Sequence, residues 1–289
     1  MGKSPSHKFG QDIGNLLEDI LKPHLLAFCN KRNLYLDYQG GRVEVRGGKK
    51  VSWEDKYGSS HDLDFVIEKG GSATRKGTPV AFIEAAWRRY TKHSRNKAQE
   101  IQGAVLPIAE KYSNDRPFLG AVLAGIFTEG ALNQLRSAGF EVLYLPHTTF
   151  AKAFKGVGIN SDFDESTNDD EFAMATAQIS ALNAKQLQKV KDHIYNQNKE
   201  AFANFFFRLT HKLDRVIEKI LLTPVFGETS SFVTVEKFAA FLEKVAEKNS
   251  HGKFLRYEVD VFFKNGDRIG GQFGDKLEVK RFIDYVQAK

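Results

Sequence analysis

The chain has 289 residues, and its 42 lysine and arginine residues against 36 aspartate and glutamate residues give a net charge of +6. This modest positive charge favours polyanionic partners, and the length allows one large or two moderate domains. The single cysteine, Cys29, excludes an internal disulfide and a cysteine-based zinc cluster, and no apolar run approaches the roughly 18 residues of a membrane-spanning helix, so we expect an intracellular protein without membrane association.

An amphipathic helix is predicted near the start of the chain. Apolar residues recur at helical spacing between Phe9 and Leu21, and Glu18 lies away from the centre of this apolar stripe. Pro23 is predicted to restart or kink the helix, because proline cannot donate to the hydrogen-bond ladder. Residues 34–46 then have the pattern of a short hairpin, with the pair Gly40-Gly41 at its turn.

Two acidic residues on adjacent predicted strands are the most informative feature of the chain. In the strand predicted at 61–67, apolar residues alternate with Asp62 and Asp64, whereas the strand at 79–87 is apolar almost throughout and carries only Glu84 as a charge. Two neighbouring carboxylates repel unless a cation or a proton lies between them, and Mg²⁺ prefers carboxylate oxygens. The pattern therefore predicts a magnesium site at Asp64 and Glu84; the alternative is ordinary ion pairing with nearby arginine and lysine.

A strongly basic helix is predicted directly after Glu84, from residue 91 towards Tyr112. Five cations and no acid occur between residues 88 and 97, interleaved with Tyr90 and small hydrogen-bonding residues. The cations are Arg88, Arg89, Lys92, Arg95 and Lys97. Such a cluster suits phosphate contacts, although an isolated charge run is usually a solvated face. Because this run is continuous with the acidic pair, we interpret it as a nucleic-acid contact.

The following segment predicts a parallel crossover. A long apolar run at 118–127 is typical of a buried strand, residues 129–138 form a helix that Gly139 ends, and 140–145 return as a strand. The order of elements predicts an α/β/α sandwich with a mixed central sheet. No G-x-G-x-x-G follows a strand and no P-loop motif occurs, which excludes nucleotide binding by those routes.

The remainder of the chain is predicted to form two further parts. We expect an α/β core at 1–156, a helical region at 157–252 whose helical pattern runs from about residue 172 to 246, and a small ββα unit at 253–289. In this last unit Asn265-Gly266 marks a tight turn between two alternating strands, and 277–286 form a closing helix. The unit has three interpretations: DNA contact, assembly or simple stabilisation.

At this point the chain resembles the PD-(D/E)XK nuclease superfamily, which includes many type II restriction endonucleases and several repair and recombination nucleases. The resemblance covers roughly residues 9–150. The superfamily has an acid on one strand, and then an acid, any residue and usually a lysine on the next. Asp64 and Glu84-Ala85-Ala86 occupy those places. Ala86 departs from the pattern, because lysine is expected there.

The resemblance implies a set of site residues and a restriction-endonuclease-like fold. Mg²⁺, or alternatively Mn²⁺, would be held by Asp64, Glu84 and the backbone carbonyl of Ala85. The role of the missing lysine would fall to Lys92 or Lys97 of the following helix, or to Arg88 on the strand.

Further residues are implied with smaller roles. Arg89 and Arg95 would position the nucleic-acid backbone, and Gln99 and Gln102 would support the same cleft. Superfamily members often place an acid of the first helix at the edge of the metal site, which makes Glu18 a candidate; the alternative for Glu18 is an ordinary surface position. Asp62 is the alternative to Asp64 as the first ligand.

The implied function is a Mg²⁺-dependent endonuclease of the type II restriction or defence class, acting on double-stranded DNA in the cytoplasm of a prokaryote. Because cleavage of both strands needs two active sites, we expect a homodimer. One alternative is a structure-specific repair or junction-resolving nuclease. The other is a non-catalytic nucleic-acid-binding module on the same scaffold, an interpretation that Ala86 favours.

Overall fold

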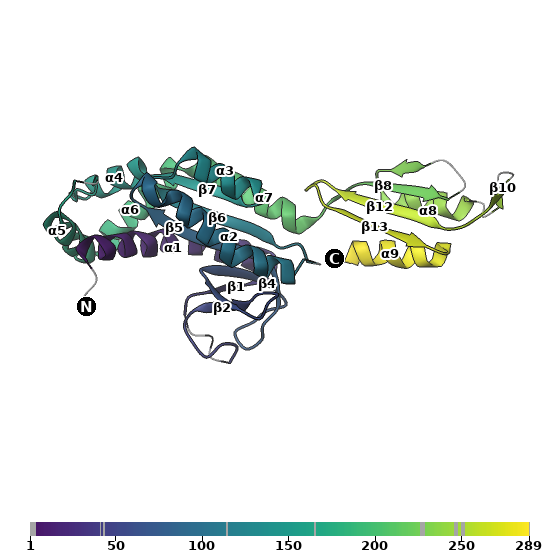
Figure 1. Cartoon of the computed structure of the whole chain (residues 1–289), viewed down its shortest axis with the longest axis horizontal. Helices are drawn as coiled ribbons and strands as arrows, with labels where there is room; N and C mark the ends of the chain where they lie inside the picture. Colours follow the sequence, from purple (N-terminus) through teal and green to yellow (C-terminus); the bar gives the residue numbers. More distant parts are fainter. Residues whose placement is uncertain are drawn as a thin grey trace. The chain divides into compact units, whose positions relative to one another are not determined.

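The protein divides into two compact units, residues 1–208 and 209–289, in a computed structural model (Figure 1). The model describes residues 4–40, 42, 44–113, 115–164, 166–225, 229–245, 248–249 and 252–288. This division differs from the three parts expected at 1–156, 157–252 and 253–289. The helices between residues 157 and 208 pack onto the core of the first unit. The second unit begins within a helix and contains more than a ββα motif.

A mixed five-stranded sheet forms the centre of the first unit, with the strand order β1-β4-β5-β6-β7. Its strands are β1 (Leu34–Tyr38), β4 (Phe65–Lys69), β5 (Thr78–Arg88), β6 (Phe118–Gly125) and β7 (Glu141–Pro146). β4 pairs antiparallel with β1 and β5, whereas β5, β6 and β7 run parallel. The predicted mixed sheet, the central position of β5 and the parallel crossover are thereby confirmed.

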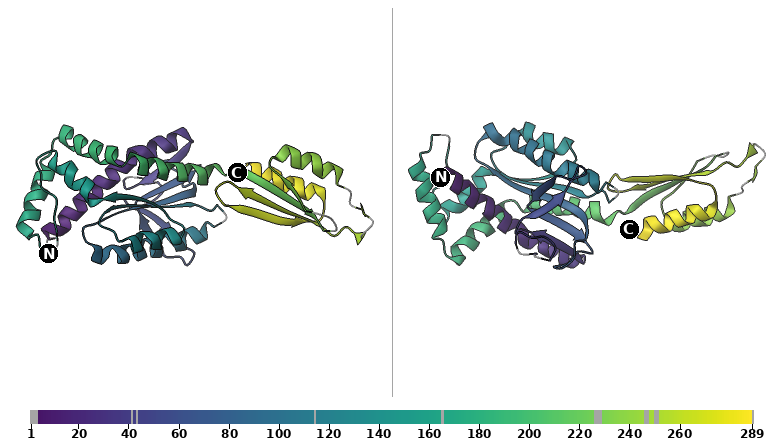
Figure 2. Two further views of the ribbon diagram at one scale, coloured as in Figure 1. Left: turned by 90° about the horizontal axis from the view of Figure 1, so that it is seen from above. Right: turned by 60° about the horizontal axis from the view of Figure 1, so that its bottom comes forward.

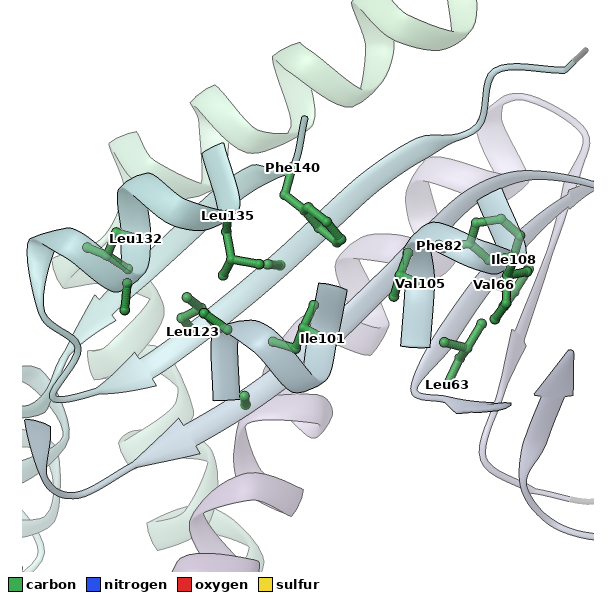
Figure 3. Packing of buried hydrophobic residues seen from close by; sticks show 14 of the residues in the cluster. Leu63, Val66, Phe82, Ile101, Val105, Ile108, Leu123, Leu132, Leu135 and Phe140 are labelled. Atoms are coloured by element: carbon green, nitrogen blue, oxygen red, sulfur yellow. The ribbon is translucent and has the colours of Figure 1, made fainter. Parts of the chain in front are cut away.

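Helices cover both faces of this sheet. α1 (Pro5–Lys31) and α7 (Lys199–Asp214) lie on one face, and α2 (Ser94–Lys111) and α3 (Glu129–Ser137) lie on the other (Figure 2). On the second face, Ile101 and Val105 of α2 and Leu135 of α3 pack against Phe82 and other sheet residues (Figure 3). Burial of these side chains fixes α2 against the strand that carries Glu84.

The first helix is continuous. α1 begins after Ser4, whose Oγ accepts a hydrogen bond from the His7 backbone N–H at 3.3 Å, and Pro5 occupies the first turn, where its missing N–H has no partner to lose. The predicted apolar stripe is buried. Pro23 lies inside α1 and does not divide it, so the expected restart does not occur.

Two strand predictions in the first unit were wrong. The expected hairpin at 34–46 does not form, because β1 pairs with β4 from Leu34↔Lys69 to Tyr38↔Phe65; Gly41 lies outside the described residues. The strand expected at 61–67 is divided between two sheets. β3 (Ser60–Leu63) pairs with β2 (Val51–Glu54) in a separate hairpin, and β4 begins at Phe65, so that Asp64 occupies the bend between them.

The helices after β7 belong to the first unit. They are α4 (His147–Lys155), α5 (Asp169–Ser180) and α6 (Ala184–Gln197), followed by α7. α5 packs on α1 through the rings of Phe172 and Phe9, whose centroids are 5.6 Å apart. Its start at Asn168 has a capping box with Glu171, which satisfies backbone donors at the helix N-terminus.

The second unit contains a four-stranded antiparallel sheet, ordered β13-β12-β8-β9, with α8 (Val235–Lys244) and α9 (Lys276–Ala288). The strands are β8 (Ile217–Pro224), β9 (Ser230–Phe232), β12 (Tyr257–Phe263) and β13 (Arg268–Phe273); the short β10 (Lys248–Asn249) and β11 (Gly252–Lys253) pair separately. The C-terminal hairpin and helix match the prediction. The helical interpretation of 172–246 was wrong for β8 and β9. Among the described residues between β9 and residue 246, the helix is α8.

The reason for this error is visible in β8. Ile220, Leu222 and Pro224 are buried and alternate with partly exposed residues, which is the period of a strand. The apolar residues at 216–222 show no clear helical or strand period in the sequence. Their strand conformation follows from the pairing of β8 with β12, which is distant in the sequence. No described helix has the length and apolar character needed to cross a membrane.

Candidate active site

Asp64 and Glu84 are joined by reciprocal hydrogen bonds. The Ala85 backbone N–H donates to Asp64 Oδ2 at 2.7 Å, and the Asp64 backbone N–H donates to Glu84 Oε1 at 3.2 Å. The pairing of Phe65 with Ile83 places the bend at Asp64 next to Glu84 of β5. Each carboxylate is therefore held against the backbone of the neighbouring segment, and the two acids converge as the sequence predicted.

Glu84 is buried and Asp64 is partly buried, and no cation is directly attached to either. Glu84 is only 7% exposed, and Leu63 and Phe65, which flank Asp64, are also buried. Among the residues that the structure describes, neither Asp64 nor Glu84 forms an ion pair within 4 Å. Among the described residues, Asp64 and Glu84 therefore do not form the ordinary ion pairs with arginine or lysine that were the alternative to a metal site.

The electrostatics of the pair favour a bound cation or a proton. Burial first, and then the charge of Asp64, raise the pKa of Glu84 to about 8, while the positive charge of Lys97 partly opposes this. Burial also raises the pKa of Asp64, against the opposing effects of the Ala85 N–H and Lys97. Without a cation, Glu84 carries a proton at neutral pH, and a divalent metal would displace that proton.

Glu18 of α1 belongs to the same electrostatic environment. Burial first, and then the charges of Asp64 and Asp19, raise its pKa to about 7. Glu18 in turn contributes to the raised pKa of Glu84. An ordinary solvated surface glutamate would not show this coupling, so the structure brings Glu18 close to the acidic pair.

Lys97 is the cation that α2 brings to the acids. Its charge lowers the pKa values of both Asp64 and Glu84. Its Nζ lies 3.3 Å from Glu100 Oε2, and the same oxygen lies 3.5 Å from Arg88 Nη2. Glu100 thus holds two of the predicted site cations, a role that we did not predict; its spacing of three residues from Lys97 on a helix was the available signal.

Ala86 lies in the core between β5 and α2. It is 4% exposed and packs in the same cluster as Ala98 and Ile101. A lysine at this position would have to share that space with the closely packed helix. Lys97 approaches the two acids from α2, the helix against which Ala86 packs.

The remaining basic residues of the run differ in their surroundings. Lys92 and Arg95 are exposed on η1 (Thr91–His93) and on the first turn of α2. The Arg89 guanidinium carbon lies 4.0 Å from the centroid of the Phe172 ring and 4.2 Å from that of Tyr90. Burial lowers the pKa of Arg89, and its Nε and Nη1 are buried with no hydrogen-bond partner. The Arg89 side chain is thus more enclosed than those of Lys92 and Arg95.

Gln99, Gln102 and Asp62 have other surroundings. Gln102 Nε2 donates a hydrogen bond to the Gln134 backbone carbonyl at 2.9 Å, and Gln102 Oε1 accepts one from Gln134 Nε2, so Gln102 bridges α2 and α3 instead of supporting the cleft. Gln99 is exposed. Asp62 accepts hydrogen bonds from Lys50 at 2.5 Å and Ser52 at 2.6 Å in the β2–β3 hairpin. These bonds lower the pKa of Asp62, with Lys50 the largest cause, and leave Asp64 as the acid that faces Glu84.

The fit of a metal to these residues can be judged from the donor set. Among the described residues there is no group of three or more histidine, cysteine, aspartate or glutamate side chains arranged to hold a metal. Asp64 and Glu84 nevertheless present two carboxylates, one partly buried and one buried, with raised pKa values and only backbone hydrogen bonds. This donor set suits a hard cation that keeps several water ligands, as Mg²⁺ does.

Comparisons with known proteins add little to this geometry. No protein-family model matches the chain, and no curated protein matches it. One solved structure, titled as a protein of unknown function, AF1548, shares 10% sequence identity with a TM-score of 0.29; the match covers 64% of this chain and 99% of that one.

Proposed function

We propose that this protein is a Mg²⁺-dependent DNA endonuclease that hydrolyses phosphodiester bonds, of the restriction or defence class. The observation that carries the proposal is the pair of Asp64 and the buried Glu84, linked to each other through backbone hydrogen bonds and approached by Lys97. The resemblance to the PD-(D/E)XK superfamily supports the same reaction, because that pattern consists of two acids and a lysine.

Each residue has a defined part in this proposal. Asp64, Glu84 and the Ala85 carbonyl hold the metal, which would supply an activated water and neutralise charge at the scissile phosphate. Lys97 faces the same acids and stabilises the negative charge that develops on the phosphate oxygens. Arg88, which shares Glu100 with Lys97, is placed to contact the same phosphate group.

The substrate and the assembly follow from charge and from the reaction. The exposed cations Lys92 and Arg95 lie on the α2 side of the acids and suit contacts to the backbone of double-stranded DNA. Cleavage of both strands of a duplex requires two active sites, so we propose that the protein acts as a homodimer.

A matched pair of variants tests this proposal. Asp64→Asn and Asp62→Asn make the same chemical change two residues apart, one in the acidic pair and one in an exposed ion pair with Lys50. With plasmid DNA and Mg²⁺ or Mn²⁺, we expect Asp64→Asn to lower the cleavage rate by at least about a hundredfold and Asp62→Asn to leave it within about threefold of wild type.

Absence of cleavage by the wild type under both metals, with DNA binding retained, would refute the catalytic proposal. It would favour instead the second candidate, a non-catalytic nucleic-acid-binding module. The buried Ala86 in place of the motif lysine is the observation that keeps this candidate open.

A further inference from the structure

A cavity of about 750 Å³ lies between the first turns of α1 and the junction of β5 with α2. Its walls include Gly10 of α1, the segment from Trp87 to Tyr90, and Glu100. Arg88 and Glu100 therefore line this cavity, and Glu100 is also ion-paired with both Arg88 and Lys97. The volume is within the range of ligand-binding pockets, so the cavity can receive a group larger than water.

The lining of the cavity favours an anion. Arg88, Arg89, His7 and His93 contribute to its walls, and Glu100 is the one acid among the described lining residues. Two helix starts, that of α1 at Pro5 and that of α2 at Ser94, are adjacent to the same lining. Cationic side chains together with the backbone donors of helix N-termini are the usual surroundings of a bound phosphate.

Buried donors without acceptors give a second, independent indication of a ligand. Trp87 is 8% exposed and lines the cavity, yet its indole Nε1 has no hydrogen-bond partner. Its Cδ1, the ring atom next to Nε1, would lie 3.9 Å from a Cβ built at Gly10, so this edge of the ring is turned towards the α1 wall. Arg89 Nε and Nη1 also lack partners. Such donors are rare in folded proteins, and phosphate oxygens that reached them after a shift of the covering side chains would satisfy them.

The first helix connects this cavity to the acidic pair. Gly10 and Gly14 precede Glu18 by eight and four residues, which places all three on one side of α1 at successive turns. A Cβ at Gly14 would meet no atom within 4 Å, so the surface between Glu18 and the cavity is open. Eight residues of helix span about 12 Å, which corresponds to the axial length of about three to four nucleotides of a duplex strand.

We propose that this cavity receives a backbone phosphate of the bound DNA strand, about three to four nucleotides from the phosphodiester at Asp64 and Glu84. The inference rests on the proposed function, because it takes the scissile phosphate at the acidic pair as its starting point. Arg89 and the Trp87 N–H are the donors to this second phosphate. The cavity thus fixes the direction of the strand across α1.

Variants that fill the cavity or remove its donors test the inference. Gly10→Leu places a side chain in the cavity on a helix that tolerates leucine, and Arg89→Met keeps the contact with the Phe172 ring but removes the guanidinium. The matched controls are Gly103→Leu, at an open position of α2 that does not line the cavity, and Lys155→Met, an exposed charge on α4. Circular dichroism and the Tm of each variant establish that it folds.

The measurement is fluorescence anisotropy with a labelled DNA duplex in EDTA, which withholds the metal and so prevents cleavage. We expect Gly10→Leu and Arg89→Met to weaken binding by about tenfold or more and both controls to stay within about twofold of wild type. Neutral methylphosphonate linkages, placed one at a time around the cut made by the wild type, should weaken wild-type binding most at about three to four nucleotides from the cut, and Gly10→Leu should lose that sensitivity.

The outcomes separate this inference from the proposed function. If the wild type cleaves DNA but both cavity variants bind like the controls, the cavity is not a phosphate site and the nuclease proposal stands. If binding is weakened only for duplexes with a 5′-terminal phosphate, an internal backbone phosphate is excluded and the inference is overturned. If the wild type does not cleave, the nuclease proposal fails, whereas a loss of affinity in both cavity variants still supports phosphate binding there.

Discussion

Glu84 gives the protein a dependence of stability on pH that magnesium should remove. Its pKa is raised from 4.5 to about 8, so the folded state binds this proton more tightly than the unfolded chain does. The contribution of Glu84 to the free energy of unfolding is therefore greatest below the unfolded pKa, falls as pH rises between the two pKa values, and is constant above the folded one. At about 1.36 kcal/mol for each pKa unit, the full loss is on the order of 5 kcal/mol.

The perturbation is Glu84→Gln, which keeps the shape of the side chain and removes the ionisable group. Both tryptophans, Trp53 and Trp87, lie in the first unit, so urea unfolding followed by tryptophan fluorescence reports on the unit that contains the site. Between about pH 5 and about pH 9 in EDTA, we expect the wild type to lose several kcal/mol relative to Glu84→Gln. At roughly 2–4 °C for each kcal/mol, its Tm should fall by about 10 °C or more relative to the variant.

Magnesium gives this experiment a second arm. At alkaline pH, Mg²⁺ should stabilise the wild type, because the metal neutralises the ionised pair in the folded state only, and should stabilise Glu84→Gln much less. Asp62→Asn serves as the control, since Asp62 is exposed and paired with Lys50. Parallel stability curves for the wild type and Glu84→Gln across this pH range would refute the reasoning, because they would mean that folding does not raise the pKa of Glu84.

Three further predictions concern other contacts. Lys97→Met should slow single-turnover cleavage by at least about a hundredfold with DNA affinity within about threefold of wild type, since its charge acts on the developing transition state; equal losses in both would make Lys97 a backbone contact. Glu100→Gln should slow cleavage by about tenfold without loss of affinity, because Glu100 holds Lys97 and Arg88 in place; unchanged cleavage would contradict that positioning role. Arg42→Met should lower the free energy of unfolding by about 3–5 kcal/mol, because it leaves Glu68 buried without its cation and Asp37 with Arg46 alone; a urea midpoint like that of the wild type would contradict this estimate.

The positions of the acids show how the tertiary structure chose between alternatives that the sequence left open. Asp62 and Asp64 have the same spacing relative to the apolar pattern, but the chain changes sheets at residue 64. Asp62 is thereby directed to Lys50, and Asp64 faces Glu84. Local alternation carries no information about a change of pairing partner, which depends on strands that are distant in the sequence.

The cations near the site provide the same lesson. Lys92, Lys97 and Arg88 were the candidates for the role of the missing lysine, and Lys97 is the one whose charge lowers the pKa values of both acids. Glu100 was not predicted, because a single acid after a basic run has the appearance of an ordinary surface residue. Its role emerges from the packing of α2 on β5, which brings Lys97 and Arg88 to the same carboxylate.

Strong local patterns determined most of the first unit from the sequence alone. The amphipathic stripe of α1, the apolar β5 with its single acid and the run from β6 to β7 each have a period or a length that only one element satisfies. The tertiary structure alone decided the partner of β1, the strand character of β8, the boundary after residue 208 and the surroundings of each charge. These features depend on contacts between distant segments, and burial and pKa values exist only once those contacts have formed.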